Sequence, residues 1–178
     1  MTLVSLVQSI QDSGIAEWMR TSVKAMPIVE SIHVLAAATV FGTIFIVDLR
    51  LLGLPNLKRS FTRISDEMLR LTWGAFGTAL ITGALMFAAN ANTYYGNTAF
   101  RLKMLALLLA GCNMAIFQLV TFRAVGTWDA AQRPPPAARL AGVLSILVWI
   151  TVIFFARWIG FTKGYHFDAA PTDVNFQF

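Results

Sequence analysis

The chain has 178 residues, of which 57% are hydrophobic and only 13% are charged, and its net charge is +5. Because a soluble domain has roughly 25% charged residues, this composition indicates one compact membrane domain and argues against a soluble enzyme. The single cysteine, Cys112, lies inside an apolar run, which excludes a disulfide framework and a cysteine-rich metal site. The basic residues lie between apolar stretches, which is typical of membrane orientation signals and not of nucleic-acid binding.

Residues 1–26 are too polar to span a membrane, and they lack the basic start, apolar run and cleavage site of a signal peptide. Apolar residues recur at helical spacing in this segment, opposite a face of Gln, Asp and Glu: Leu3, Leu6, Val7, Ile10, Gly14 and Trp18. The pattern predicts an amphipathic helix that lies in the membrane interface and is broken or weakened near Ser13 and Gly14. A solvated helix that packs on the mouth of a helix bundle is an equally good interpretation.

Four apolar stretches follow. They predict an all-α polytopic membrane protein with four transmembrane helices in a bundle, at Pro27–Leu54, Leu71–Ala89, about Leu102–Phe122, and Leu140–Phe161. In the first stretch, Ile28–Val47 alone supplies about 30 Å of helix, the thickness of a bilayer's hydrocarbon core. Pro27 is expected to open this helix, and Gly53 and Pro55 to close it. The chain is therefore divided into an interfacial segment (1–26), a four-helix domain (27–161) and a polar tail without assigned structure (162–178).

The segments between the spans are predicted to be loops: a basic loop at Pro55–Arg70, a polar turn at Asn90–Phe100, and a segment at Arg123–Arg139. Eight Lys and Arg residues lie around the first and third of these, and five lie around the middle one and the two terminal segments. This excess places the first and third loops in the cytoplasm and both termini on the non-cytoplasmic side of a bacterial inner membrane. Arg20 and Lys24, directly before the first span, favour the opposite orientation.

Polar residues within the spans fall into two layers. The outer layer holds Glu30, His33, Met86 and Arg157, and the opposite layer holds Asp48, Arg50, Gln118 and Arg123, with Asn113 between them. We expect a structural ion pair between Glu30 and Arg157, pairing of Asp48 with Arg50 or Arg123, and an interhelical hydrogen bond from Asn113. His33 is expected to be a hydrogen-bonded helix residue, with a metal or haem ligand and a proton relay as alternatives.

Several motifs together identify a resemblance to a family. P-x-x-E-x-x-H begins the first span and D-L-R-L-L-G (48–53) ends it, and further matching segments include Thr82-Gly83, Trp128-Asp129 and Arg157-Trp158-Ile159. The chain resembles an uncharacterised family of small bacterial membrane proteins, known as a domain of unknown function. The resemblance implies four membrane helices and brings no assigned activity. The family often has a histidine near the end of the third span, where this chain has Gln118.

Two main classes of function remain. The first is a non-enzymatic subunit or accessory protein of a membrane complex, whose polar layers hold the bundle and which contacts a partner through the amphipathic N-terminus or the tail. Helix faces rich in small residues are a further candidate surface for other membrane subunits or a second copy. The second is a redox bundle that binds haem b or copper at His33, with His166 or Met86 as a further ligand. Transport of protons or a small solute along Glu30, His33 and Asp48 is a third interpretation. No nucleophile–base set, phosphate-binding Gly loop or paired cysteine motif is present, which argues against catalysis of the kind found in soluble enzymes. We therefore expect no enzymatic activity and no bound cofactor, with haem b or copper at His33 as the alternative.

Overall fold

The computed structural model describes residues 2–54, 60–129 and 134–162, and every regular element in these ranges is a helix. The order is α1 (Leu3–Gln11), α2 (Gly14–Thr21), α3 (Ala25–Leu51), α4 (Phe61–Ala89), α5 (Ala91–Gly96), α6 (Thr98–Ile116), the π-helix η1 (Phe117–Thr121), the 3-10 helix η2 (Phe122–Thr127) and α7 (Pro136–Thr162). Four helices are long and apolar enough to cross a membrane: α3, α4, α6 continued by η1, and α7. The predicted all-α membrane fold is confirmed.

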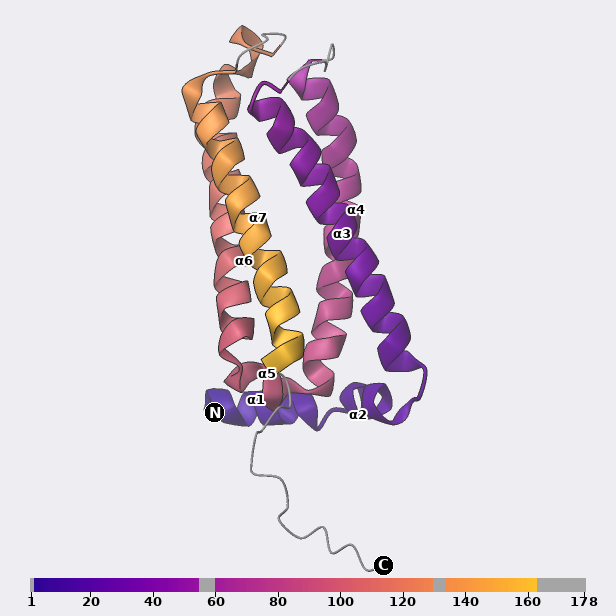
Figure 1. Cartoon of the computed structure of the whole chain (residues 1–178). Coiled ribbons are helices and arrows are strands. Elements are labelled where there is room, and N and C mark those ends of the chain that lie inside the picture. The colour runs from indigo at the N-terminus through magenta and orange to yellow at the C-terminus, as the bar shows by residue number, and fades with distance from the viewer. Residues whose placement is uncertain (1, 55–59, 130–133, 163–178) are drawn as a thin grey trace, which may run out of the picture.

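The four long helices form two antiparallel hairpins, α3 with α4 and α6 with α7 (Figure 1). The main contact between the hairpins is made by α3 and α7. The helices α1, α2 and α5 lie across one end of the bundle, which also holds the start of α3 and the end of α7 (Figure 1). We call this the terminal end, and we call the opposite end, where α3 finishes and α4 begins, the loop end.

The N-terminal segment forms two helices with a break between Gln11 and Gly14, as the sequence predicts. The side chains of Thr2 and Ser13 accept hydrogen bonds from backbone N–H groups in the first turns of α1 and α2. Arg20 of α2 then fixes the pair to the bundle, because its guanidinium donates to the carbonyl oxygens of Gln11 (2.9 Å) and Ala89 (3.0 Å). Their position in a membrane interface stays a prediction.

The first span begins two residues earlier than predicted, at Ala25, whose N–H donates to the hydroxyl of Ser22. Its end is the predicted glycine stop. Gly53 has a φ of 72°, a left-handed conformation that other residues rarely adopt, and the N–H groups of Gly53 and Leu54 donate to the carbonyls of Arg50 and Leu49. These two bonds form a Schellman motif that satisfies the last carbonyls of α3.

The second span differs from the prediction, because α4 begins at Phe61 and includes much of the predicted loop Pro55–Arg70. The cause is a contact from a distant part of the chain. Asp129 accepts hydrogen bonds from the N–H and hydroxyl of Thr62 (both 2.8 Å), and its carbonyl accepts from the N–H of Phe61 (3.1 Å). A helix start that is capped from outside its own segment leaves no local signal in the sequence.

The remaining boundaries also extend or divide the predicted spans. The polar turn at Asn90–Phe100 holds α5 and the start of α6, where the Asn97 side chain accepts a hydrogen bond from the N–H of Phe100. The third span is not one continuous α-helix, since it changes to π-helix at Phe117 and to 3-10 helix at Phe122. The tail beyond Thr162 lies outside the described residues.

Candidate functional site

His33 lies in the interface between α3 and α4, toward the terminal end. Its Nδ1 is 3.0 Å from the hydroxyl of Thr82, and the Thr82 hydroxyl is itself 2.7 Å from the carbonyl oxygen of Thr78. Since a hydroxyl has one proton, the Thr82 proton goes to its own helix and its oxygen accepts from the imidazole. This arrangement favours the tautomer with the proton on Nδ1, which leaves Nε2 as an acceptor.

Gly83 allows the imidazole to lie against α4. A Cβ atom at this position would be 3.0 Å from Cε1 of His33, which is tighter than most real Cβ contacts, so the imidazole would have to shift by a few tenths of an ångström. Nε2 of His33 has no hydrogen-bond partner in the described part of the chain. An imidazole that is oriented by Nδ1–H and open at Nε2 has the arrangement of a typical metal-ligating histidine.

The predicted ion pair of the outer layer, between Glu30 and Arg157, is not formed among the described residues. Glu30 and Arg157 are both exposed, and within the described ranges no hydrogen bond or ion pair joins them. The predicted Glu30–Arg157 pair is therefore wrong, and the Arg157 guanidinium instead lies 5.4 Å from the ring centroid of Phe161 on its own helix. The physical reason is the fold: α3 pairs with α4 at this end, while its main contact with α7 involves Leu51 and Asp48.

Of the two further predicted ligands, the structure describes only Met86. Met86 packs with the apolar cluster of Met19, Ala25, Val29 and Ala89, one turn of α4 below Thr82. His166 lies outside the described residues. The charged groups close enough to interact with His33 electrostatically are Glu30 and Lys103.

At the loop end, Asp48 is buried where α3 crosses α7. Its carboxyl group accepts a hydrogen bond from the Ser145 hydroxyl, and its second oxygen, Oδ2, has no partner among the described residues. Gly142 makes the close approach of the helices possible, because a Cβ there would be 3.1 Å from Cβ of Leu51 and 3.2 Å from the carbonyl oxygen of Asp48. Asp48 thus contacts Ser145 and not the predicted Arg50 or Arg123.

Arg50 is buried as well, and it reaches a different part of the loop end. Its guanidinium donates to the carbonyl oxygen of Asp129 (3.1 Å), the same residue that caps α4. Next to this bond lies an apolar cluster of Leu51, Phe61, Phe117, Trp128 and Ala138. Arg50 and Asp129 together join α3, the segment after η2 and the start of α4.

Single hydrogen bonds connect the helices of each hairpin between the two layers. Asn113 forms the predicted interhelical bond, from its Nδ2 to the carbonyl oxygen of Ala141 on α7 (3.1 Å). The hydroxyls of Thr43 and Thr72 are 2.7 Å apart in the interface of α3 and α4. Gln118 is half-buried in η1, and Arg123 is exposed in η2.

The sequence did not single out Asp129, Ser145, Thr82 or Lys103 as site residues. Asp129 stood only in the family motif with Trp128, and that motif was the available signal for its capping role. Thr82 likewise stood only in the family segment Thr82-Gly83. Ser145 looks like an ordinary helix residue, and only the packing of two helices gives it a partner. Lys103, which was counted with the middle loop, lies half-buried in α6.

The described residues contain no group of three or more His, Cys, Asp and Glu placed to hold a metal ion. His33 is an oriented single ligand, and Asp48 is a buried acid about 22 Å away along the same helix. Ala36 and Val40 are buried between them.

No curated protein and no solved structure matches the chain. A family model does match it, over residues 20–162, which include all four spans and both polar layers, and its description is a family of unknown function. The chain belongs to this family of unknown function, DUF6644.

Proposed function

We propose that the protein is a non-catalytic subunit or accessory component of a membrane complex. The observation that carries this proposal is the way the spans pack: two paired hairpins meet mainly through α3 and α7. In the most apolar 18-residue stretch of each span, only 11–22% of the residues are buried, so most of the helix surface is left for lipids and other membrane helices. The polar groups within the bundle and at its ends support the same interpretation, since Arg20, Arg50, Asn113 and Asp129 each connect one element to another.

The direct test is the size and composition of the native assembly. After extraction in a mild detergent, the protein should migrate in a particle well above its own mass of 19.6 kDa and should contain a second polypeptide at fixed stoichiometry. A particle that holds one copy of this chain and no other polypeptide would contradict the proposal.

A second candidate function, haem b or copper binding, is favoured by one observation, the orientation of His33. Its Nε2 is open and its Nδ1 is held by Thr82, as in many metal-ligating histidines. Absorption spectra and metal analysis of the purified protein distinguish the two candidates. A Soret band or stoichiometric copper that disappears in His33→Ala, with the helix content unchanged, would establish the redox function.

The orientation in the membrane belongs to the same proposal. We place both termini and the α1–α2 pair on the non-cytoplasmic side, in the interface, because of the excess of Lys and Arg at the loop end. In a Cys112→Ser background, an impermeant thiol reagent added to intact cells should label Asn92→Cys in α5 and should not label Arg63→Cys in α4. The opposite labelling pattern would show that the protein has the reverse orientation in the membrane.

A further inference from the structure

Two adjoining grooves on the outside of the α3–α4 hairpin share one residue, Arg70. The groove toward the membrane has a volume of about 370 Å³, which is in the range of small-molecule sites. It is lined by Arg70 and by residues that are mostly apolar or small: Ile32, Leu35, Ala36, Thr39, Leu71, Gly74, Ala75 and Thr78. The second groove continues toward the start of α4 and is lined by Thr62, Arg63, Asp66, Glu67 and Arg70.

Apart from Arg70, the side chains that line the first groove have no polar group available to bind a ligand. The hydroxyls of its two threonines donate to carbonyl oxygens of their own helices, Thr39 to Leu35 (2.9 Å) and Thr78 to Gly74 (3.0 Å). A Cβ atom at Gly74 would meet nothing within 4 Å, so the groove is open at this point. The chemistry fits a hydrocarbon chain.

Arg70 lies at the depth where a lipid changes from hydrocarbon to head group. It is 19 residues before Ala89, which is about 28 Å along the helix and close to the thickness of the hydrocarbon core. With Ala89 at one membrane surface, Arg70 is therefore at the other. A lipid of that leaflet would pass from its head group at Arg70 into the apolar groove with its acyl chain.

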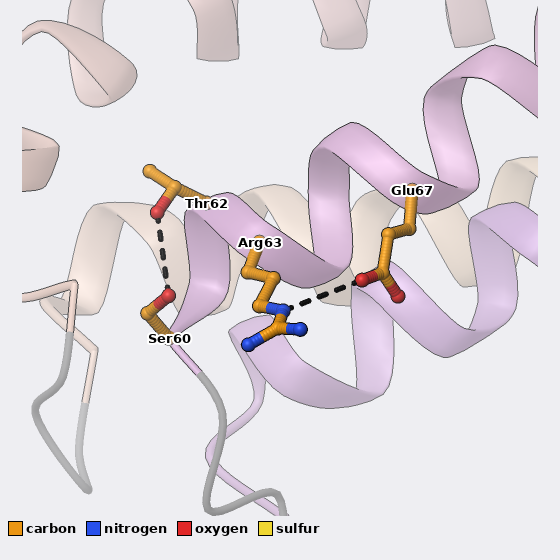
Figure 2. A network of polar contacts seen from close by, with 4 residues as sticks. All are labelled: Ser60, Thr62, Arg63 and Glu67. Atoms are coloured by element: carbon orange, nitrogen blue, oxygen red, sulfur yellow. Dashed lines mark hydrogen bonds and ion pairs between the residues drawn. The ribbon is translucent and has the colours of Figure 1, made fainter.

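The polar groove carries both signs of charge. Arg63 and Glu67 form an ion pair at 3.4 Å, shown in Figure 2. Arg70 and Asp66 are exposed, and in the described part of the chain neither has a hydrogen bond or an ion pair. A guanidinium recognises a phosphate through paired hydrogen bonds, and a carboxylate accepts hydrogen bonds from an ammonium group.

We propose that the two grooves together bind one zwitterionic phospholipid with a primary ammonium group. The acyl chain lies in the groove between α3 and α4, the phosphate binds Arg70, and the ammonium group binds Asp66. This inference is independent of the proposed function, because it concerns the outer face of one hairpin and needs no partner protein.

Native mass spectrometry of the full-length protein in a mild detergent tests the proposal. The protein is titrated with phosphatidylethanolamine, phosphatidylcholine and phosphatidylglycerol that have identical acyl chains. We expect the ethanolamine lipid to bind roughly tenfold tighter than the choline lipid, because choline has no N–H to donate to Asp66. Asp66→Asn should abolish this preference, and Arg70→Gln should weaken the binding of all three lipids.

The groove itself has a matched control. Gly74→Leu should fill the groove and weaken the binding of every lipid. Gly111→Leu on α6, at a similar depth and also in open space, should leave lipid binding unchanged. Circular dichroism checks that each variant keeps its helices. Equal affinity for the three lipids, tightest binding of the glycerol lipid, or equal effects of the two glycine variants would overturn the proposal. The proposal would also be overturned if the wild-type protein were a dimer and Gly74→Leu a monomer, because the groove would then bind a second copy of the chain.

Discussion

The two ends of the bundle use polar residues in different ways. At the loop end, polar side chains form hydrogen bonds to groups on other elements: Asp48, Arg50 and Asp129. Asp48 and Arg50 are buried, and so is Phe61 at the start of α4. At the terminal end, His33 is half-buried with one ring nitrogen open, and the charges of Glu30 and Arg157 are exposed.

This difference separates residues that hold the fold from residues that are free to do something else. Substitutions at the loop end should reduce stability because they remove contacts between distant segments. Substitutions of Glu30, His33 and Arg157 at the terminal end should leave the fold intact, so an effect of these substitutions on function can be interpreted. Four predictions test the comparison, from the largest expected effect to the smallest.

Phe61→Ala should have the largest effect. The Phe61 side chain has no exposed surface, and its ring packs with those of Phe117, Phe122 and Trp128. Removing a buried aromatic ring costs about 3–5 kcal/mol of folding free energy. Thermal unfolding in detergent measures the loss, and Phe76→Ala, on the exposed face of the same helix, should lose far less.

Gly142→Val comes next, because it forces α3 and α7 apart. The new side chain would meet Leu51 and the backbone of Asp48, and overpacking of this kind costs about 1–3 kcal/mol. Disulfide cross-linking of engineered cysteine pairs across α3 and α7 would report the separation directly. Wild-type cross-linking efficiency in the variant would show that the crossing is looser than its distances indicate.

Asp129→Ala removes the cap of α4. The expected cost is about 1–2 kcal/mol, typical of a lost helix cap, and it should be localised at Phe61–Arg70. Hydrogen exchange read by mass spectrometry should show faster exchange in this segment and little change in α6. If exchange is unchanged, then the start of α4 does not depend on its distant cap.

Glu30 and Arg157 should give the smallest effect. Because the two residues are exposed and do not pair, Glu30→Gln and Arg157→Met should each be nearly neutral, and their effects on unfolding should add. A double-mutant cycle in detergent measures the coupling. A coupling energy clearly different from zero would mean that Glu30 and Arg157 interact. Polar residues at the terminal end would then stabilise the fold as they do at the loop end.

Much of the fold followed from the sequence. Each apolar run is about as long as a bilayer crossing requires, the break before Gly14 interrupts an amphipathic pattern, and Gly53 supplies a left-handed helix stop. The site was less predictable. His33 and Asn113 stood out as polar residues in apolar surroundings, but the expected partner of Glu30 was wrong and Asp48 bonds to Ser145 instead of an arginine.

The sequence by itself determined where helices exist, because apolar length, capping residues and glycine stops act over a few neighbouring residues. Only the tertiary structure decided which helices meet, and therefore which polar groups become partners. Equal depth in a membrane places two residues in one layer and says nothing about which helix faces which. Asp129 starts a helix that lies nearly seventy residues before it, and a contact over that distance exists only when the two hairpins have packed.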